Sequence, residues 1–356
     1  MDLIEPVGRK SITSVLDEAN IEGRVRRTMA TGFSPLDRVM GGGLRTRNLT
    51  LVGGAPGAGK TITTLQWARN LARDGRRCVF ACYEHDEGTL LGRLLRLELG
   101  AMPASERLSD RGRAARATLN RLDAGDLTLR EAVEQAPILS APEAELRGYA
   151  DRLWLVRASG AHTTLDELEE LVDEDTDALF VDYIQKVPLD GDGGERERIT
   201  VVAQGLKELA MSRNVAVVAV AAANVEGLEA PRLRLRHLRG SSAIAYEADV
   251  VVMLNDKFDI VSRSQMTHDL SNAESFKNQL IFSVEKNRDG DDMIDIEFHK
   301  QFDYLRVDPA GSLVKERLID NRLFMECSGR PIGVSAKGGL QSSLSGVAAS
   351  SSTSTR

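Results

Sequence analysis

Gly54-Ala55-Pro56-Gly57-Ala58-Gly59-Lys60-Thr61 is the stretch around which the rest of the chain can be interpreted. It fills every fixed position of the pattern G-x-x-x-x-G-K-[ST], a loop whose backbone N–H groups surround phosphates. The apolar run before it (48–52) predicts a buried strand, and apolar residues at helical spacing after it predict a helix. In such a loop Lys60 reaches the β- and γ-phosphates and Thr61 ligates Mg²⁺. The sequence therefore predicts a site for a nucleoside triphosphate.

The composition is that of an ordinary globular chain. Of its 356 residues, 42% are hydrophobic and 28% charged, which suits one large α/β domain or two smaller ones. The net charge of −7 gives no overall attraction to nucleic acid or to an anionic membrane, so such binding needs a local basic patch. The first ten residues lack the apolar segment of a signal peptide, and the longest apolar run, Val215–Ala223, is too short to span a membrane. We expect a cytoplasmic protein without a membrane partner.

The sequence pattern divides the chain into three segments. Residues 1–30 form an arm with a short amphipathic helix, whose apolar face must be covered by its own domain or by a neighbouring subunit. The apolar residues of this helix are Ile12, Val15, Leu16 and Ala19. Residues 31–326 alternate strands and helices, which predicts an α/β domain with a mainly parallel central sheet covered by helices on both faces. Residues 327–356 are rich in Gly and Ser and too poor in large apolar residues to pack, so we expect a disordered tail.

Two acidic residues that follow predicted strands are the candidates for chemistry. Asp182 follows the apolar run 178–181, at the end of a parallel strand where ligands bind, and there it can hold Mg²⁺ or simply cap a turn. Glu84 ends the apolar run Cys78–Tyr83, and a buried carboxylate beside the γ-phosphate can orient and deprotonate the attacking water. We predict Glu84 as the catalytic base and Asp182, with Thr61, as the metal ligands.

Two basic segments leave their interpretation open. Lys286 and Arg288 lie in a turn after a predicted strand, which is either a charged hairpin turn or a pair of cations that completes a neighbouring subunit's nucleotide site. Several arginines in the loop 224–242 form either the solvated face of an edge strand or contacts to nucleic-acid phosphates. These arginines are Arg232, Arg234, Arg236 and Arg239. Aromatic residues make up only 4% of the chain, which argues against a platform that stacks bases.

Taken together and in this order, these landmarks resemble the C-terminal ATPase domain of the DnaB-type replicative helicases, members of the RecA-like ATPase superfamily. The matching segments, within about residues 31–308, are TGFSPLDRVMGGGL, the phosphate loop, VFACYE, LFVDYIQ, LRGSSAIAYEADVVVML and EKNRDG. The block Leu238–Leu254 and the run Asp182-Tyr183-Ile184-Gln185 are the most specific of these. The resemblance implies a RecA-like P-loop NTPase core that hydrolyses ATP with Mg²⁺ and moves along single-stranded DNA as a ring hexamer, typically 5′ to 3′, in DNA replication.

The resemblance also implies roles for single residues. Glu84 is similar to the family's catalytic glutamate, and Asp182 to its Mg²⁺-associated aspartate. Lys286 and Arg288 resemble the lysine and arginine fingers that reach across a subunit boundary. Arg239, with the neighbouring Gly240 and Ser242, matches the pore loop that holds the DNA backbone, and the amphipathic helix of the arm resembles the linker helix that docks on an adjacent subunit.

The sequence departs from the family pattern at three points. Ala222 stands where a strand should end in a glutamine that senses the γ-phosphate, although Asn224 is retained nearby, and Gly240 stands where glutamate is usual. Residues 1–30 are too few for the amino-terminal domain that engages primase, so primase is not an expected partner. Two other interpretations stay open: a RadA- or KaiC-like ATPase of DNA repair or regulation, and an ATP-dependent scaffold that does not hydrolyse.

Overall fold

The computed structural model describes residues 11–14, 16, 27–189, 194–240, 244, 246–261, 275–316 and 318–319, which belong to one compact unit. The predicted tail and Ser242 lie outside the described residues. In the predicted arm, residues 12–14 and 16 are helical, whereas Val15 and Ala19 are not described. Ile12 and Leu16 are 82% and 58% exposed, so the cover of this apolar face by a neighbouring subunit stays a prediction.

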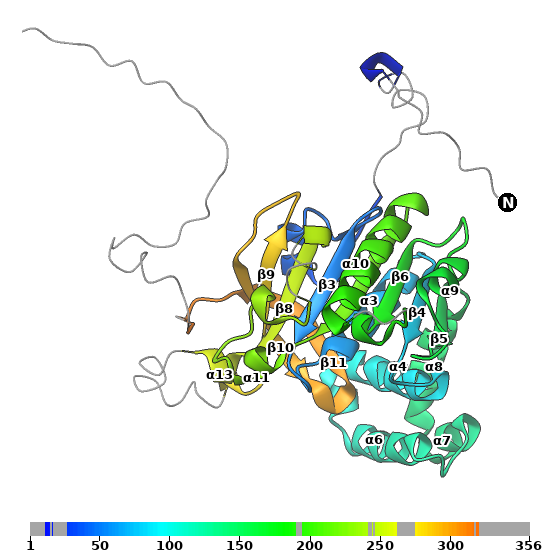
Figure 1. Ribbon diagram of the computed structural model, residues 1–356. Coiled ribbons are helices and arrows are strands. Elements are labelled where there is room, and N and C mark those ends of the chain that lie inside the picture. Colours follow the sequence, from blue (N-terminus) through cyan, green and yellow to red (C-terminus); the bar gives the residue numbers. More distant parts are fainter. Residues whose placement is uncertain are drawn as a thin grey trace, which may run out of the picture. The chain divides into compact units, whose positions relative to one another are not determined.

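A nine-stranded sheet runs through the unit in the order β11-β10-β9-β8-β3-β7-β6-β4-β5 (Figure 1). The strands from β8 to β5 in this order are parallel, whereas β9, β10 and β11 are antiparallel to their neighbours. The mainly parallel sheet predicted from the sequence is thus confirmed. The strands are β3 (Leu49–Gly54), β4 (Cys78–Cys82), β5 (Leu153–Arg157), β6 (Ala178–Asp182), β7 (Ala216–Ala222), β8 (Val250–Asp256), β9 (Gln279–Asn287), β10 (Ile294–Gln301) and β11 (Arg306–Leu313); β1 (Thr28–Met29) and β2 (Leu44–Arg45) form a separate pair.

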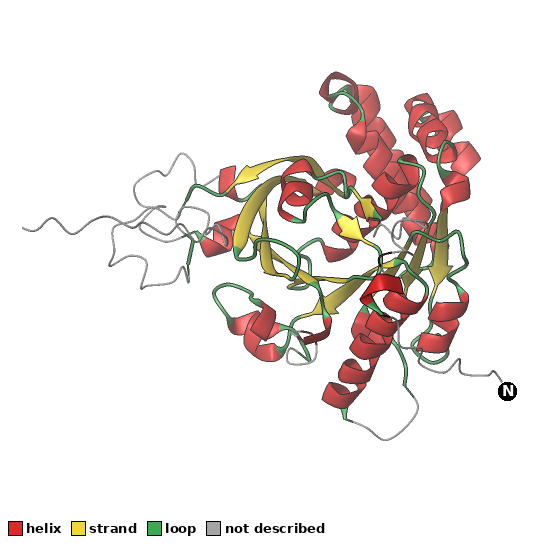
Figure 2. Cartoon of the chain, turned by 90° about the horizontal axis from the view of Figure 1, so that it is seen from above, coloured by secondary structure: helices red, strands yellow, loops and turns green. Residues whose placement is uncertain are grey.

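Helices cover both faces of the sheet (Figure 2), because the strands are apolar on both sides. The face packed against α3 and α4 is centred on the aromatic residues Phe33, Trp67, Phe282 and Phe298. On the other face, Leu179 and Val217 of the sheet share one apolar core with Leu168 of α9 and Leu206 of α10. Beyond the arm, the described residues include the α-helices α2 (Ser34–Val39), α3 (Lys60–Arg73), α4 (Glu87–Ala101), α5 (Ala104–Arg107), α6 (Asp110–Asp123), α7 (Leu129–Gln135), α8 (Ser140–Arg147), α9 (Leu165–Glu170), α10 (Glu195–Ser212), α11 (Val225–Glu229) and α13 (Lys257–Ile260).

Local signals explain where several helices begin. Asp86 caps α4 by accepting a hydrogen bond from the Thr89 N–H at 2.7 Å, and Thr164 with Glu167 forms a capping box at the start of α9. The segment 101–150 is mostly helical (Figure 1), and its helices share a small core with α4. Among the described residues, no helix combines the length and apolar character needed to span a membrane.

The strand directions define two edges of the sheet that matter for function. The parallel strands β3, β4, β6 and β7 end at the same edge, and the register pairs Gly54 of β3 with Ala222 of β7. Strand β9 runs the opposite way beside β8, so its last residue, Asn287, pairs with Val250, the first residue of β8. Residues after β9 therefore lie at the edge opposite to the one that carries the phosphate loop.

Candidate nucleotide-binding site

The predicted phosphate loop joins β3 to the 14-residue helix α3, as the sequence indicates. Gly57 and Gly59 have φ angles of +78° and +88°, a region that side chains rarely adopt. A Cβ at Gly57 would meet nothing within 4 Å, so this part of the loop is open to a ligand. A Cβ at Gly59 would lie 2.6 Å from Cζ of Phe302, so the ring of Phe302 requires glycine there. The loop and the helix N-terminus form a cradle suited to phosphate.

Lys60, Thr61 and Asp182 converge at this loop. The Lys60 ammonium donates to the carbonyl oxygens of Gly54 and Ala55 at 3.0 and 2.9 Å, within the loop that it would leave to contact a phosphate. The Thr61 hydroxyl donates to Oδ2 of Asp182 at 2.6 Å. Asp182 is 1% exposed, and its Oδ1 is buried without a hydrogen-bond partner in the described part of the chain.

The electrostatics of Asp182 fit a cation ligand. Burial raises the pKa of Asp182 to about 6, against the opposing effect of the hydrogen bond from Thr61. A buried carboxylate oxygen without a hydrogen bond costs free energy, and a bound cation would remove that cost. The residues therefore fit Mg²⁺ held by Thr61 and Asp182 together with phosphate oxygens and water.

Glu84 lies near this centre but is exposed, so the predicted burial of its carboxylate is wrong. Strand β4 ends at Cys82 rather than at Tyr83, and the chain then turns outward, with Tyr83 Oη donating to the Thr163 carbonyl at 2.7 Å. The proximity of Glu84 is evident from Lys60: burial lowers the pKa of its ammonium, whereas the carboxylates of Asp182 and Glu84 raise it. Glu84 therefore stands at the open rim of the site.

Two further polar residues reach this site without having been singled out from the sequence. Arg93 of α4 donates through Nη2 to Nε2 of His85 at 2.8 Å, and its charge acts on Asp182. Gln185, which follows β6, is buried and accepts a hydrogen bond from the Ala222 N–H. The sequence could have indicated Gln185, because it is a polar residue three positions after an Asp that ends a strand. Arg93 could not be predicted in this way, because its place at the site depends on how α4 is oriented.

Lys286 and Arg288 lie at the opposite edge of the sheet from the phosphate loop. The Arg288 N–H donates to the Asp249 carbonyl, and the Asp249 N–H donates to the Leu49 carbonyl at the start of β3, both at 2.9 Å. The phosphate loop begins five residues further along, roughly 16 Å away at the rise of a β-strand. Neither side chain can reach the nucleotide site of its own subunit across that distance.

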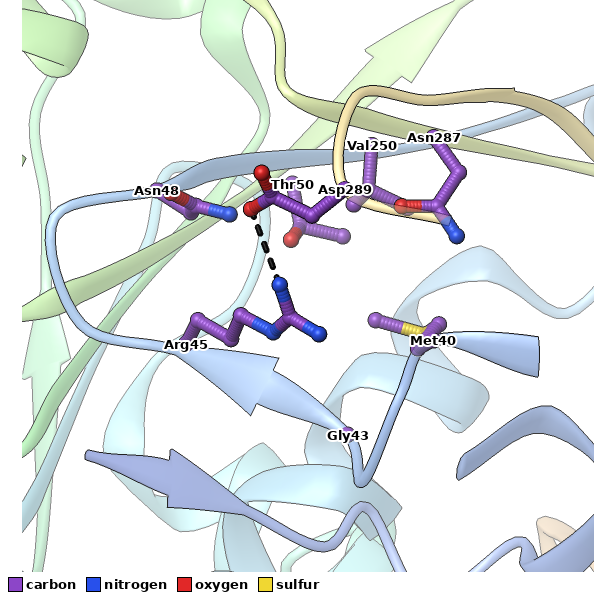
Figure 3. A pocket seen from close by; sticks show the side chains of 8 residues that line it. All are labelled: Met40, Gly43, Arg45, Asn48, Thr50, Val250, Asn287 and Asp289. Atoms are coloured by element: carbon purple, nitrogen blue, oxygen red, sulfur yellow. Dashed lines mark ion pairs between the residues drawn. The ribbon is translucent and has the colours of Figure 1, made fainter. Parts of the chain in front are cut away.

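The turn that carries Arg288 is anchored on both sides. Asn287 Nδ2 donates to the Val39 carbonyl at 3.0 Å, and Arg45 pairs with Asp289 at 2.9 Å (Figure 3). A small crevice beside this ion pair is lined by Met40, Gly43, Arg45, Asn48, Thr50, Val250, Asn287 and Asp289. Asp249 adds a third anchor, because its carboxylate contacts the Arg288 guanidinium at 3.4 Å and Lys207 at 2.6 Å. These contacts fix the backbone from which Arg288 projects.

The four arginines of the loop 224–242 fall into two pairs, and neither interpretation drawn from their spacing describes all of them. Arg232 is fully buried and bonds Asp295 and Ser283, and Arg234 pairs with Glu285 at 2.7 Å. Both are buried and hold the loop on the acidic side chains of β9 and β10, which argues against the predicted contacts of Arg232 and Arg234 with nucleic acid. Arg236 and Arg239 are exposed, and Arg239 pairs with Glu195 of α10 at 3.0 Å.

The fold and this site together define a P-loop nucleoside triphosphate-binding protein with a RecA-like core. Residues 28–306 match the family described as the DnaB-like helicase C terminal domain, and the chain belongs to that family. The chain is 29% identical over 237 residues to the replicative DNA helicase DnaB of Treponema pallidum, covering 64% of this chain and 48% of that protein. It is 39% identical over 71 residues to the DNA repair protein RadA of Mycolicibacterium smegmatis, covering 20% and 15% of the two chains.

Solved structures show the same fold. One of them, an ATPase domain, aligns with a TM-score of 0.64 at 20% identity, covering 85% of this chain and 99% of that one. A DnaB-like replicative helicase, whose structure was described with its interactions with primase, aligns with a TM-score of 0.63 at 19% identity, covering 85% and 67% of the two chains. The match covers 48% of the Treponema pallidum helicase, so the chain spans about half the length of that relative.

Proposed function

We propose that this chain hydrolyses ATP with Mg²⁺ and moves along single-stranded DNA, 5′ to 3′, as a ring of identical subunits, a hexameric replicative helicase. The observation that carries the proposal is the separation between the phosphate loop and Arg288 within one subunit. An arginine anchored at the far edge of the sheet has a catalytic use only if it completes the site of a neighbour. Membership of the DnaB-like helicase family supports the same arrangement.

On the nucleotide side, the loop Gly54–Thr61 holds the phosphates, and Thr61 with Asp182 holds Mg²⁺. Bound Mg²⁺ neutralises charge on the phosphate oxygens and on the leaving group. Lys60 leaves its two carbonyl partners and donates to the β- and γ-phosphates. Glu84 orients the attacking water and accepts its proton. A neighbouring subunit that covers the rim would exclude bulk water from around the exposed Glu84 carboxylate.

The neighbouring subunit supplies the remaining positive charge. Lys286 lies near the end of β9 rather than in the turn predicted for it, and Arg288 lies in the anchored turn that follows. Little backbone freedom is therefore lost when the two side chains leave their contacts to Ala248 and Asp249 for the γ-phosphate next door. Charge placed there stabilises the transition state of phosphoryl transfer. A subunit on its own would therefore bind ATP and hydrolyse it slowly.

On the DNA side, we assign the backbone contacts to Arg236, Arg239 and Ser242. The chain has a net charge of −7, so binding to a polyanion must come from a local group of cations such as this one. Arg239 is 44% exposed and shares its guanidinium with Glu195, an ion pair weak enough to be exchanged for a phosphate.

The test is strand displacement from a forked DNA substrate, with particle mass measured with and without ATP and single-stranded DNA. We expect displacement that requires ATP and Mg²⁺, a particle several times the 38.8 kDa chain mass, and no activity in Lys60→Ala. A chain that remains a monomer in every nucleotide and DNA condition would overturn the proposal.

A RadA-like role in DNA repair is the second candidate, because RadA proteins share up to 43% identity with short stretches of this chain. It predicts DNA-stimulated hydrolysis but no displacement from a simple fork. A scaffold that does not hydrolyse, suggested by Ala222, predicts no phosphate release with or without DNA.

A further inference from the structure

Gln185 occupies an unusual position between the nucleotide site and the loop of Arg239. It lies in the short 3₁₀ turn Ile184–Lys186 after β6, three residues beyond Asp182, and is 6% exposed. Its Oε1 accepts a hydrogen bond from the Ala222 N–H at 3.1 Å. Because a backbone N–H can only donate, this bond fixes which end of the amide is the oxygen. The Nε2 group is left buried and without a hydrogen-bond partner among the described residues.

Ala222 links this amide to both functional regions. It pairs in register with Gly54, the first residue of the phosphate loop. Its carbonyl oxygen accepts a hydrogen bond from the Arg239 N–H at 3.1 Å. Since alanine offers only main-chain groups, the side chain that bonds the end of β7 is that of Gln185.

Two residues of helix α10 also contact Gln185 and Arg239. Arg198 Nη2 donates to the main-chain carbonyl of Gln185 at 3.4 Å, and the Glu195 carboxylate accepts from the Arg239 guanidinium. A Cβ at Gly240 would lie 2.4 Å from Cγ2 of Ile199, so the backbone at Gly240 packs directly against α10. Rotation of the Gln185 side-chain amide therefore alters its bond to the Ala222 N–H, and Ala222 is the residue whose carbonyl accepts from the Arg239 N–H.

We propose that Gln185 is the positioning residue that transmits occupancy of the nucleotide site to the DNA-contact loop at Arg239. This inference rests on the proposed function, because it assigns the coupling between that nucleotide site and that DNA loop. An oxygen acceptor at the ends of β3 and β6, whether the γ-phosphate or the attacking water, satisfies the buried Nε2 donors. The amide turns to meet it, the hydrogen bond to the Ala222 N–H is altered, and the end of β7 with Arg239 shifts.

The test compares three variants whose folding is first verified by thermal melting. Gln185→Leu removes both ends of the amide, whereas Gln185→Glu keeps an acceptor for Ala222, loses the donor end and adds a carboxylate. Gln66→Leu is the matched control, because Gln66 is also a buried glutamine but has both ends paired with the backbone of Val307, at 2.8 and 2.9 Å. The readouts are the affinity for a fluorescent ADP and the ratio of single-stranded-DNA affinities with a non-hydrolysable ATP analogue and with ADP.

We expect both Gln185 variants to bind ADP like the wild type and to lose at least about fivefold of the DNA-affinity ratio, the lower end of usual allosteric couplings. Gln66→Leu should lower the melting temperature and keep the wild-type ratio. A Gln185→Leu or Gln185→Glu protein with the wild-type ratio overturns the inference alone. A wild-type chain whose DNA affinity does not depend on the nucleotide overturns the proposed function, and the inference with it.

Discussion

The hydroxyl of Thr61 donates a hydrogen bond to Oδ2 of Asp182 across 2.6 Å, joining residues 121 positions apart in the chain. This bond brings the first turn of α3 to the end of β6. It leaves Oδ1 of the same carboxylate buried and available to a cation. This geometry supports the assignment of Asp182 as a Mg²⁺ ligand, and the protonation of Asp182 should make Mg²⁺ binding depend on pH.

Binding of Mg²⁺ with nucleotide should weaken as the pH falls through about 6. Burial raises the pKa of Asp182 to about 6, so below that pH the carboxyl is neutral and must release a proton before it can hold the metal. Calorimetry with Mg·ADP between pH 5 and 8 should show affinity falling by up to about tenfold per pH unit below 6. Asp182→Asn removes the titrating group, so an unchanged slope in that variant would refute the assignment.

The same raised pKa predicts the stability of the ligand-free chain. The folded state holds the Asp182 proton more tightly than the unfolded state, so this carboxyl favours folding at low pH and loses that contribution as the pH rises from about 4 to 6. We expect Asp182→Asn to melt at a higher temperature than the wild type at pH 7.5 without Mg²⁺. Equal melting temperatures at pH 7.5 would mean that the carboxylate is not desolvated.

Glu84→Gln should abolish hydrolysis and preserve nucleotide binding. Glutamine cannot accept the proton of the attacking water, and loss of a general base costs about 10²–10⁴-fold in rate. Because Glu84 is exposed, the melting temperature should stay within error of the wild type. Phosphate release and fluorescent-ADP titration measure the two effects, and Glu87→Gln, an exposed neighbour, is the control. Hydrolysis at the wild-type rate would remove Glu84 from the mechanism.

Arg288→Ala should act in the neighbouring subunit rather than in its own. Mixed with Glu84→Gln subunits, Arg288→Ala subunits should regain hydrolysis, because a hybrid interface combines an intact Glu84 with an intact Arg288. We expect each variant alone to be nearly inactive and the mixture to pass through a maximum of activity as the ratio is varied. Arg213→Ala, which removes an exposed arginine paired with Glu169, should neither lose activity nor rescue. Absence of rescue at every ratio would contradict fingers in trans.

Arg232 and Arg239 should give opposite phenotypes. Arg232 is fully buried against Asp295, which is 22% exposed, so Arg232→Ala should cost about 2–4 kcal/mol of unfolding free energy, somewhat below the usual cost of breaking a buried pair. Arg239→Ala should leave stability nearly unchanged and reduce the salt dependence of DNA binding by about 0.7 in log–log slope. Urea unfolding and DNA titrations at several salt concentrations measure the two. A stable Arg232→Ala protein with weakened DNA binding would reverse these roles.

The sequence alone determined the features that depend on neighbours along the chain. The phosphate loop, the strand before it and the helix after it follow from short patterns of apolar and glycine residues. These patterns act within a few residues, so they have the same meaning in any fold. The acidic residue at the end of β6 could be assigned because parallel strands end at one edge of the sheet.

Only the tertiary structure decided what depends on contacts between distant segments. The arginines at 232 and 234 turn toward the sheet because Asp295 and Glu285 stand on β10 and β9, a fact invisible in the spacing of the loop. Glu84 is exposed because β4 ends at Cys82, and Gln185 meets Ala222 because β6 lies beside β7. Side-chain direction and burial are set by the strand order, and strand order is fixed by packing energies summed over the whole chain rather than by any local pattern.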